Sequence, residues 1–370
     1  MAHPASESRQ PLIVVEDDPF PRILQVVLDP TVTQERTDAF IDFFAHTTDF
    51  PAWCDSVRAA VGTMYPSTVV TVKTQEDLRA KLPGAQAVVT ESLAVGAEEL
   101  EAGMDLKLVQ KYGLITRAID TAACRARGLP VATQRRRSNI ACAEASLALM
   151  LDIAKKLHIT HGLLSMEQLQ AAGYQPKMYD RRHTGNSNWA RIPGIRMLYE
   201  STLGIVGFGE IGRELSTRAA AMGMKVLYWQ RTPVPAAEAA VYGAEYAPIE
   251  TLLAASDYVS VQLPGNASTR HILDRGRIAQ MKPGTILVNS SRADLIERAA
   301  VVDALASGHL GGFGLDTPYD EPGSADDPLL KFPNVTITPH TAAQPRTNAL
   351  KDLGEMMIGM AKLLVHVPAR

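Results

Sequence analysis

The stretch LGIVGFGEIGRELSTRAAAMGMKVLYW, residues 203–229, decides the fold of this chain. It begins as a β-rich run, continues as a helix-period segment and ends in a second β-rich run. Gly207, Gly209 and Gly212 stand between the first run and the helix at G-x-G-x-x-G spacing. In that context the first glycine permits a tight turn, the second lets the backbone approach a pyrophosphate, and the third lets helix and strand pack closely. The stretch therefore predicts a dinucleotide-binding βαβ unit with helix N–H groups facing the phosphates, although a purely structural Gly-rich turn shares this pattern.

The residues around this unit indicate which dinucleotide is bound. We expect the turn residues Phe208, Glu210 and Ile211 to contact the cofactor together with the three glycines. An acidic residue usually follows the glycines by about 20 positions and binds the adenosine ribose. Gln230 stands near that place here, followed by Arg231 and Thr232. A guanidinium suits a 2′-phosphate by charge and bidentate geometry, so we expect NADP as the cofactor, with NAD as the alternative if Arg231 is only a solvated surface residue.

Short β-rich runs alternate with helix-period segments through most of the chain, which is typical of parallel sheets with helices on both faces. We expect strands at Ile23–Leu28, Thr68–Val72, Ala87–Thr90, Lys107–Tyr112 and Val131–Thr133, and later at Thr202–Gly207, Met224–Trp229, Tyr258–Leu263, Thr285–Asn289, Gly312–Asp316 and Val335–Thr338. Residues 142–157 and 346–365 have helical patterns, and residues 165–197 indicate a long loop. The sequence thus predicts an α/β protein with two doubly wound parallel-sheet domains.

The composition favours a protein that acts on small molecules. Of the 370 residues 46% are hydrophobic and 21% are charged, and the net charge of −3 lacks the basic excess of a nucleic-acid-binding protein. The cysteines Cys54, Cys124 and Cys142 are scattered and predict neither a disulfide framework nor a metal site. No apolar run is long enough to span a membrane, and the N-terminal MAHPASESRQ lacks the apolar core of a signal peptide, so we expect a cytoplasmic protein.

Ionisable residues follow three of the later strands. Arg292 comes after TILVN, Asp316 and Glu321 follow GFGL, and His340 follows VTIT. Because loops beyond the carboxyl ends of neighbouring parallel strands meet in one crevice, we expect these four residues to lie together. Reduction of a 2-oxo acid needs a proton donor that works near neutral pH, a carboxylate that orients it and a cation that clamps the substrate, and His340, Glu321 and Arg292 are of these types. Each residue alone is also compatible with an ordinary turn or surface position, but their combination behind a dinucleotide fold favours catalysis.

From about Leu106 to Ala343 the chain resembles the D-isomer-specific 2-hydroxyacid dehydrogenase family. The matching motifs are TLGIVGFGEIG, MKPGTILVNSSR, VDALASGHLGGFGLDTPYDEP (from Val302) and NVTITPHTA. The resemblance implies that Arg292, Glu321 and His340 are the catalytic set and that Asp316 supports the nicotinamide side of the site. It also implies cofactor contacts at Leu263, Pro264, Ser290, Ser291 and His340.

The same resemblance implies the domain organisation and the assembly. We expect a flavodoxin-like substrate domain formed by residues 1–137 and 343–370, a Rossmann coenzyme domain formed by residues 138–342, a cleft between them, and a homodimer formed through the coenzyme domain. The substrate carboxylate would be held by backbone N–H groups of Leu114 and Ile115, within YGLITRAID. Ile115 stands where a second glycine is common, and Gln262 stands where a histidine is common. These departures concern the substrate pocket more than the reaction.

Three functions remain open at this point. The first is an NADP-preferring oxidoreductase that interconverts a 2-oxo acid and a D-2-hydroxy acid. The second is an imine reductase acting on 2-imino acids, which uses the same hydride geometry. The third is a non-catalytic, nucleotide-sensing binding protein on the same scaffold. The complete set of Arg292, Glu321 and His340 favours an enzyme.

Overall fold

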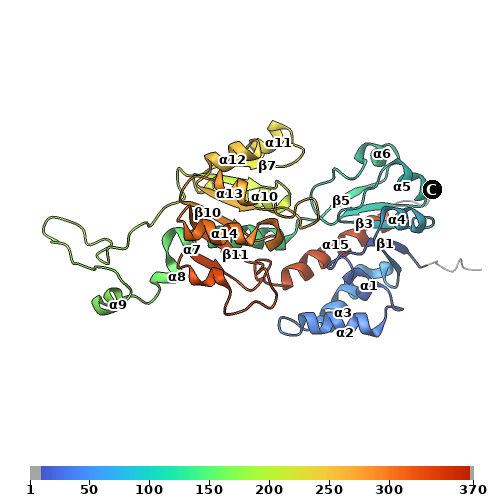
Figure 1. Ribbon diagram of the computed structural model, residues 1–370. Helices are drawn as coiled ribbons and strands as arrows, with labels where there is room; N and C mark the ends of the chain where they lie inside the picture. The colour runs from blue at the N-terminus through green and yellow to red at the C-terminus, as the bar shows by residue number, and fades with distance from the viewer. Residues whose placement is uncertain (1–9, 367–370) are drawn as a thin grey trace, which may run out of the picture. The chain divides into compact units, whose positions relative to one another are not determined.

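The computed structural model describes residues 10–366. The chain forms two compact units, which comprise Met1–Ser138 with Gln344–Arg370 (unit 1) and Asn139–Ala343 (unit 2). Each unit is built on one sheet whose strands are all parallel (Figure 1). The predicted class, an α/β protein with two parallel sheets, is therefore confirmed.

Unit 1 has a five-stranded sheet in the order β2-β1-β3-β4-β5, which is the flavodoxin-like order. Its elements are β1 (Leu12–Glu16), α1 (Ile23–Leu28), α2 (Gln34–Phe44), α3 (Phe50–Val61), β2 (Thr68–Val72), α4 (Gln75–Lys81), β3 (Ala87–Thr90), α5 (Ala97–Ala102), β4 (Leu108–Lys111), α6 (Thr121–Ala126), β5 (Val131–Thr133) and α15 (Thr347–His366). Successive residues of β1 alternate between two apolar cores: Ile13 and Val15 face one, and Val14 faces the other. Burial on both faces explains why β1 and β3 are continuous apolar runs.

One predicted strand of unit 1 is wrong. The run ILQVVL at Ile23–Leu28 forms α1, and the strand is the shorter run at Leu12–Glu16, which we did not predict. A short apolar run does not by itself distinguish a buried helix from a buried strand. Five of the six residues in α1 are buried, and Gln25 uses its side-chain amide to donate to the Val69 carbonyl at 3.0 Å. Packing against β2 and α3 thus overrides the β propensity of this run.

The last helix completes unit 1, although the whole of unit 2 separates it in sequence from the rest. Helix α15 contributes Leu350, Leu353, Met356, Met357, Met360 and Ala361 to the core that also contains α1 and α3. The Arg137 guanidinium donates to Asp352 Oδ1 at 2.6 Å and to Glu355 Oε2 at 2.8 Å. These contacts join α15 to the end of the first segment of unit 1.

Unit 2 has a seven-stranded sheet in the order β12-β11-β10-β9-β6-β7-β8. Counted within the unit, this is the Rossmann order with one added strand, and the strand order reverses between β6 and β9. Its elements are α7 (Arg137–Lys155), α8 (Leu157–Thr160), α9 (Met166–Ala171), β6 (Thr202–Val206), α10 (Glu210–Ala221), β7 (Lys225–Trp229), α11 (Ala236–Val241), β8 (Ala244–Tyr246), α12 (Ile249–Ala255), β9 (Tyr258–Val261), α13 (Arg275–Ala279), β10 (Thr285–Asn289), α14 (Arg298–Ala306), β11 (Leu310–Leu315) and β12 (Val335–Ile337). Leu287 of β10 packs with α12 to α14, whereas Ile286 and Val288 pack with α7 and α10, so helices cover both faces.

The segment 165–197 is mostly irregular, as expected, but it contains the short helix α9. Ser165 begins that helix with a capping box, in which its side chain accepts from the Gln168 N–H at 3.1 Å. Most side chains of the segment are exposed, including Met178, Ile195 and Met197. Among the described residues, no helix has the length and apolar character that crossing a membrane requires.

Candidate active site

The turn of residues 207–212, between β6 and α10, has the shape that the glycine spacing predicts. Gly207 has a φ of +110°, and a Cβ there would lie 2.3 Å from the Gln262 carbonyl oxygen. A Cβ at Gly212 would lie 2.3 Å from the Gly207 carbonyl oxygen. A Cβ at Gly209, by contrast, would meet nothing within 4 Å. The first and third glycines are therefore required by the fold, and the second leaves open space at the start of α10, where a phosphate can approach N–H groups.

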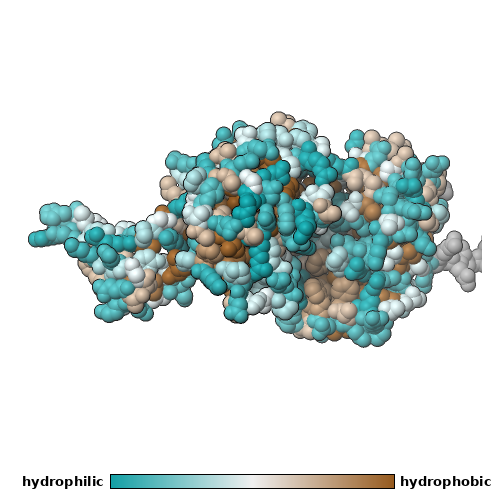
Figure 2. All heavy atoms as spheres, in the orientation of Figure 1, coloured by the Kyte–Doolittle hydropathy of each residue, from teal (hydrophilic) through white to brown (hydrophobic). Residues whose placement is uncertain are grey.

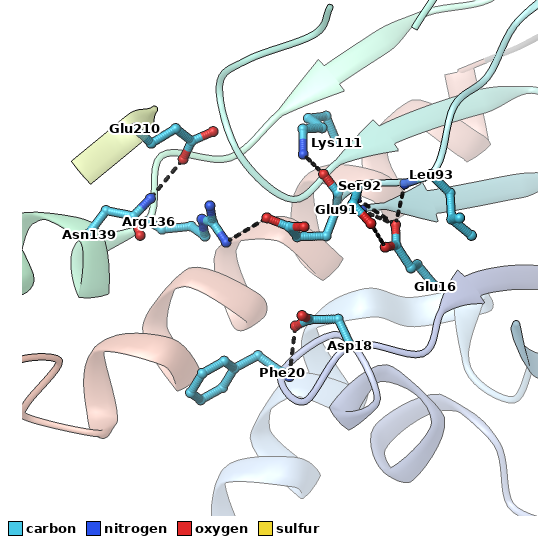
Figure 3. A network of polar contacts seen from close by, with 10 residues as sticks. All are labelled: Glu16, Asp18, Phe20, Glu91, Ser92, Leu93, Lys111, Arg136, Asn139 and Glu210. Atoms are coloured by element: carbon cyan, nitrogen blue, oxygen red, sulfur yellow. Dashed lines mark hydrogen bonds and ion pairs between the residues drawn. The ribbon is translucent and has the colours of Figure 1, made fainter. Parts of the chain in front are cut away.

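The side chains of this turn stabilise it through contacts with the rest of unit 2. Phe208 is fully buried and stacks on Tyr228 with ring centroids 4.0 Å apart. Glu210 accepts a hydrogen bond from Asn139 Nδ2 at 2.7 Å (Figure 3), and Ile211 is half-buried against the core that contains α10. Contacts of Phe208 with a cofactor would therefore come from its backbone, because its ring is directed into the core.

The residues after β7 lie at the surface, where an adenosine ribose would be bound. Gln230 Nε2 donates to the Thr232 carbonyl at 2.6 Å, and Arg231 Nη2 donates to Ser268 Oγ at 3.3 Å. Arg231 and Thr232 are exposed. Ser268 was not among the residues expected from the sequence. Its hydroxyl accepts from the guanidinium and donates to Asn266 Oδ1 at 2.7 Å, so it helps to position Arg231. No motif marks it, because it lies in the loop after β9 and is brought here only by the fold.

The loops after β9 and β10 contain the other expected cofactor residues. Leu263 is half-buried and Pro264 is exposed. Ser291 Oγ donates to the Val261 carbonyl at 2.9 Å, and Ser290 Oγ lies 2.7 Å from Ser146 Oγ in a buried cluster. That cluster includes Gln262, whose Nε2 donates to Ser146 Oγ at 3.0 Å and to Ser290 Oγ at 3.2 Å. Both serine hydroxyls therefore bind the protein itself, and the Ser291 backbone does so too, because its N–H donates to Asn289 Oδ1 at 2.9 Å.

Three of the expected catalytic residues line one pocket of about 450 Å³ in unit 2, which we call the catalytic pocket. His340 Nδ1 lies 3.0 Å from Glu321 Oε1, and both side chains are about half exposed. Arg292 is exposed, donates to the Ser291 carbonyl at 2.8 Å and forms no ion pair with a carboxylate of the described residues. A Cβ at Gly265 would lie 2.8 Å from Arg292 Cγ, so the absence of a side chain there lets the arginine stem pack. The pocket thus combines an acid–base pair with a cation available for an anionic ligand.

Asp316 lies beside His340, whose N–H donates to its carbonyl at 2.7 Å, and its expected role on the nicotinamide side stays a prediction. Its side chain is buried, its Oδ1 accepts from Thr338 Oγ1 at 2.7 Å and from the Thr341 N–H at 2.9 Å, and its Oδ2 accepts from the Ala342 N–H at 3.0 Å. His340 lies inside this turn with a φ of +55°, a conformation that costs energy for a residue with a Cβ. The carboxylate contacts the turn that presents His340 and is positioned to hold it in this conformation.

Leu114 and Ile115, the expected substrate contacts, follow β4 in unit 1. Leu114 is 45% exposed although it is apolar, and Gly113 before it has a φ of +144°. At the same edge of the sheet the buried Glu16 carboxylate accepts the backbone N–H groups of residues 91, 92 and 93 at 2.6–2.9 Å (Figure 3). That contact fixes the loop after β3 next to the loop that carries Leu114.

A group of charged residues that the motifs did not indicate lies at this edge of unit 1. Arg136 Nη1 lies 3.3 Å from Glu91 Oε1, and its guanidinium lies 5.1 Å from the centre of the buried Tyr112 ring. Lys111 Nζ donates to the Glu91 carbonyl. The pKa of Asp18 is raised above its usual value, because burial and the nearby Glu91 outweigh the hydrogen bond from the Phe20 N–H. Burial likewise raises the pKa of the Tyr112 phenol. Among the described residues, no group of three or more His, Cys, Asp or Glu side chains has the arrangement of a metal site.

Comparison with known proteins identifies similar sequences and folds. Residues 148–342 match the family model described as D-isomer specific 2-hydroxyacid dehydrogenase, NAD binding domain. A D-3-phosphoglycerate dehydrogenase of Archaeoglobus fulgidus is 31% identical over 298 residues, which cover 80% of this chain and 53% of that protein, so the chain spans about half of its length. A glyoxylate reductase of Thermococcus litoralis is 32% identical over 273 residues, covering 72% of this chain and 78% of that protein. The crystal structure of apo D-mandelate dehydrogenase from Rhodotorula graminis, 23% identical, shares the fold with a TM-score of 0.55 over 95% of this chain and 93% of that one.

Proposed function

Because the chain belongs to the D-isomer-specific 2-hydroxyacid dehydrogenase family, we propose that it interconverts a 2-oxo acid and a D-2-hydroxy acid with a nicotinamide dinucleotide. The observation that carries this proposal is the meeting of Arg292, Glu321 and His340 in one pocket. Glu321 and His340 come 29 and 48 positions after Arg292 in the sequence, so the proximity of the three residues is a property of the fold. Residues 1–138 and 344–370 form the substrate domain in this proposal.

The turn at residues 207–212 would hold the pyrophosphate, because it offers open space and helix N–H groups. When bound, the dinucleotide supplies a hydride to the substrate carbon or accepts one from it. His340 gives a proton to the carbonyl oxygen in reduction and takes it back in oxidation. Glu321 binds Nδ1 at 3.0 Å, which leaves Nε2 as the nitrogen that exchanges this proton.

Arg292 provides the positive charge of the reaction. Its guanidinium can bind the substrate carboxylate and polarise the carbonyl that receives the hydride. The backbone N–H groups of Leu114 and Ile115 would hold the carboxylate from the substrate domain. A planar fork is the appropriate group here, because it can make two parallel hydrogen bonds to one carboxylate.

We infer that NADPH is preferred over NADH. Gln230 removes the negative charge that would repel a 2′-phosphate, and Arg231 is exposed beside the Ser268 hydroxyl at 3.3 Å. The guanidinium, which this hydroxyl positions, and the Thr232 hydroxyl form a set of donors without a carboxylate. Such a set favours a phosphate over two ribose hydroxyl groups.

We propose a homodimer formed through unit 2. Among the described residues eleven large hydrophobic side chains are exposed, and six of them lie between Leu157 and Tyr199, with Leu164 80% and Met197 57% exposed. Figure 2 shows apolar atoms on the part of the surface formed by α9, whereas most of the face in view is hydrophilic. Scattered exposed apolar side chains are ordinary, but a concentration in one segment is typical of an interface. Sedimentation of wild type and Leu164→Glu tests this: the variant should dissociate, and an unchanged sedimentation coefficient would exclude Leu164 from the interface.

The function is tested by mixing the protein with NADPH or NADH and a panel of 2-oxo acids. We expect oxidation of the dinucleotide with at least one acid, and loss of that activity in His340→Ala. Tight nucleotide binding without turnover of any acid would favour the nucleotide-sensing protein. Turnover only when ammonia is added would favour reduction of a 2-imino acid.

A further inference from the structure

Unit 1 contains a second pocket, of about 500 Å³, that lies outside the residues assigned to catalysis. It is formed by the loop after β1 and by α2, and we call it the aromatic pocket. Its lining residues are Pro19, Phe20, Arg22, Thr33, Glu35, Arg36, Ala39, Phe40 and Phe43. Three of these nine residues are phenylalanines, so flat apolar rings form part of the walls beside polar and charged side chains.

The phenylalanine rings are held in place by neighbours outside the pocket. Phe40 stacks on Phe50, with ring centroids 6.0 Å apart. Phe43 lies under the Arg346 guanidinium, 4.1 Å from its ring centre. Both rings are half-buried and remain part of the lining. A rigid apolar wall that is already formed loses little entropy when it binds a flat ligand.

The charged residues that line the aromatic pocket are two guanidinium groups, of Arg22 and Arg36, and one carboxylate, of Glu35. Arg22 is neutralised by Asp17, whose Oδ1 lies 2.5 Å from Nε. Arg36 donates to Gln25 Oε1 and forms no ion pair with a carboxylate of the described residues. A guanidinium binds the face of an aromatic ring and attracts an anion, whereas it gains nothing from a saturated ring. The lining therefore offers the face of an aromatic ring both flat apolar walls and the Arg36 guanidinium.

The aromatic pocket adjoins the carboxyl edge of the unit 1 sheet. The loop after β1 carries Asp18 toward the charged group at that edge, and the Phe20 N–H donates to Asp18 Oδ1 at 3.2 Å. Figure 3 shows the Phe20 ring pointing away from the Asp18 carboxylate. Strand β3 lies between β1 and β4, so two strand spacings, roughly 10 Å, separate this loop from the loop that carries Leu114. A substrate held by its carboxylate at Leu114 reaches the aromatic pocket only if its tail has about that length.

We propose that the aromatic pocket binds the ring of an aryl-substituted 2-oxo acid and so selects the substrate. This inference rests on the proposed function, and it adds the substrate class. A phenyl group joined to the oxo acid by two or three methylene groups has the required length and planarity. Short acids lack the group that fills the pocket.

The test compares kcat/KM for 2-oxo-4-phenylbutanoate and 2-oxobutanoate, which share the reacting end. Ala39 is exposed on α2 and lines the pocket, so Ala39→Phe fills it without removing a core side chain. Ala59→Phe is the matched control, since Ala59 is exposed on α3 outside the lining. We expect wild type to favour the phenyl acid by at least about tenfold, and Ala39→Phe to abolish that preference while 2-oxobutanoate changes by less than about twofold. A preference that is absent in wild type, or that Ala39→Phe and Ala59→Phe change equally, would overturn the inference.

Two further measurements test the role of the ring and separate this inference from the proposed function. Arg36→Met keeps an apolar stem but lacks the guanidinium, so it should lower the selectivity for phenyl over the cyclohexyl analogue. Calorimetry with 4-phenylbutanoate, which has no carbonyl to reduce, should show binding that Ala39→Phe abolishes and Ala59→Phe retains. If no 2-oxo acid of the panel is reduced, the proposed function fails, and the calorimetric result alone decides on the pocket. Selective loss of binding in Ala39→Phe then supports the pocket as an aryl-carboxylate site, whereas no binding or unaltered binding rejects it.

Discussion

The Asp316 backbone carbonyl accepts the His340 N–H at 2.7 Å, while the Asp316 carboxylate accepts donors from the residues on both sides of the histidine. His340 has a φ of +55°, and the three contacts of the carboxylate enclose it in one turn. We infer that Asp316 is a positioning residue for the imidazole. It acts through the backbone and does not itself need to touch the substrate.

Asp316→Asn should lower activity without removing any group from the catalytic pocket. The asparagine NH₂ would face the Ala342 N–H or the Thr341 N–H, because both carboxylate oxygens are acceptors. We expect a loss of about 1–3 kcal/mol in the free energy of unfolding and a fall of about 10- to 100-fold in kcat. Asp274→Asn is the control, because Asp274 caps α13 and asparagine caps as well as aspartate. Equal stability and activity in both variants would show that Asp316 has no positioning role.

His340→Ala should lower kcat by about 10²- to 10⁴-fold and leave the dissociation constant of NADPH nearly unchanged. The imidazole is about half exposed beside Glu321, so its removal leaves no buried cavity. Single-turnover kinetics and fluorescence titration of NADPH measure the two effects separately. An unchanged rate in the chemical step would exclude His340 as the proton donor.

Arg292→Lys should not restore activity, although the charge is kept. Lysine cannot make two parallel hydrogen bonds to one carboxylate, and loss of one such charged bond costs about 1.5–3 kcal/mol. We expect kcat/KM to fall by about 10- to 100-fold. Near-wild-type kcat/KM would mean that the carboxylate is held elsewhere, with the backbone at Leu114 as the next candidate.

The double change Gln230→Asp with Arg231→Ile should reverse the preference for NADPH. The new carboxylate accepts the ribose hydroxyls, and the 2′-phosphate loses the guanidinium. Arg231 contributes about 10- to 100-fold in preference if its charged hydrogen bonds have their usual strength. The ratio of kcat/KM for the two cofactors is the measurement, and Ser268→Ala should lower the NADPH preference by a smaller factor. An unmodified protein that prefers NADH would mean that Arg231 points into solvent.

Unit 1 should lose stability in acid through Asp29. Burial would raise the pKa of this carboxyl, but hydrogen bonds from the Val69 N–H, the Thr31 hydroxyl and the Thr31 N–H outweigh burial and lower it. A lowered pKa contributes stability above the unfolded value of about 3.9, and this is lost as pH falls through the folded value. Asp29→Asn should therefore lower the melting temperature more at pH 6 than at pH 3. Asp55→Asn, at an exposed position, should have no such effect, and a pH-independent loss for Asp29→Asn would contradict the assignment.

The parts of the fold that could be predicted are those specified by local pattern. The glycine turn and its strands, most strands of both sheets and the family resemblance are correct, because each depends on a motif or a period of a few residues. The strand at Leu12–Glu16 and the helix at Ile23–Leu28 were missed for one reason. Both are short runs rich in Val, Ile and Leu, and only pairing with β2 and β3, which are distant in sequence, decides which becomes the strand.

The residues of the candidate site also fall into those that a motif predicts and those that only the fold brings together. Arg292, Glu321 and His340 are found by motif, and the fold places them in one pocket. Ser268 beside Arg231, and Phe20 beside Phe40, belong to different elements and carry no motif of their own. The structure also shows contacts of the Asp316 carboxylate that a sequence cannot, since they depend on a turn in which His340 has a positive φ.

Helix α15 has a consequence for the order in which the protein is made. The first segment of unit 1 emerges from the ribosome long before residues 344–366. The core that needs Leu353, Met357 and Met360 therefore stays incomplete while all of unit 2 is synthesised. Unit 2 is continuous and can fold as soon as it has emerged. During that interval the nascent first segment therefore exposes the apolar face of α1 and α3. This interval is the stage of biosynthesis at which a chaperone would bind exposed apolar surface.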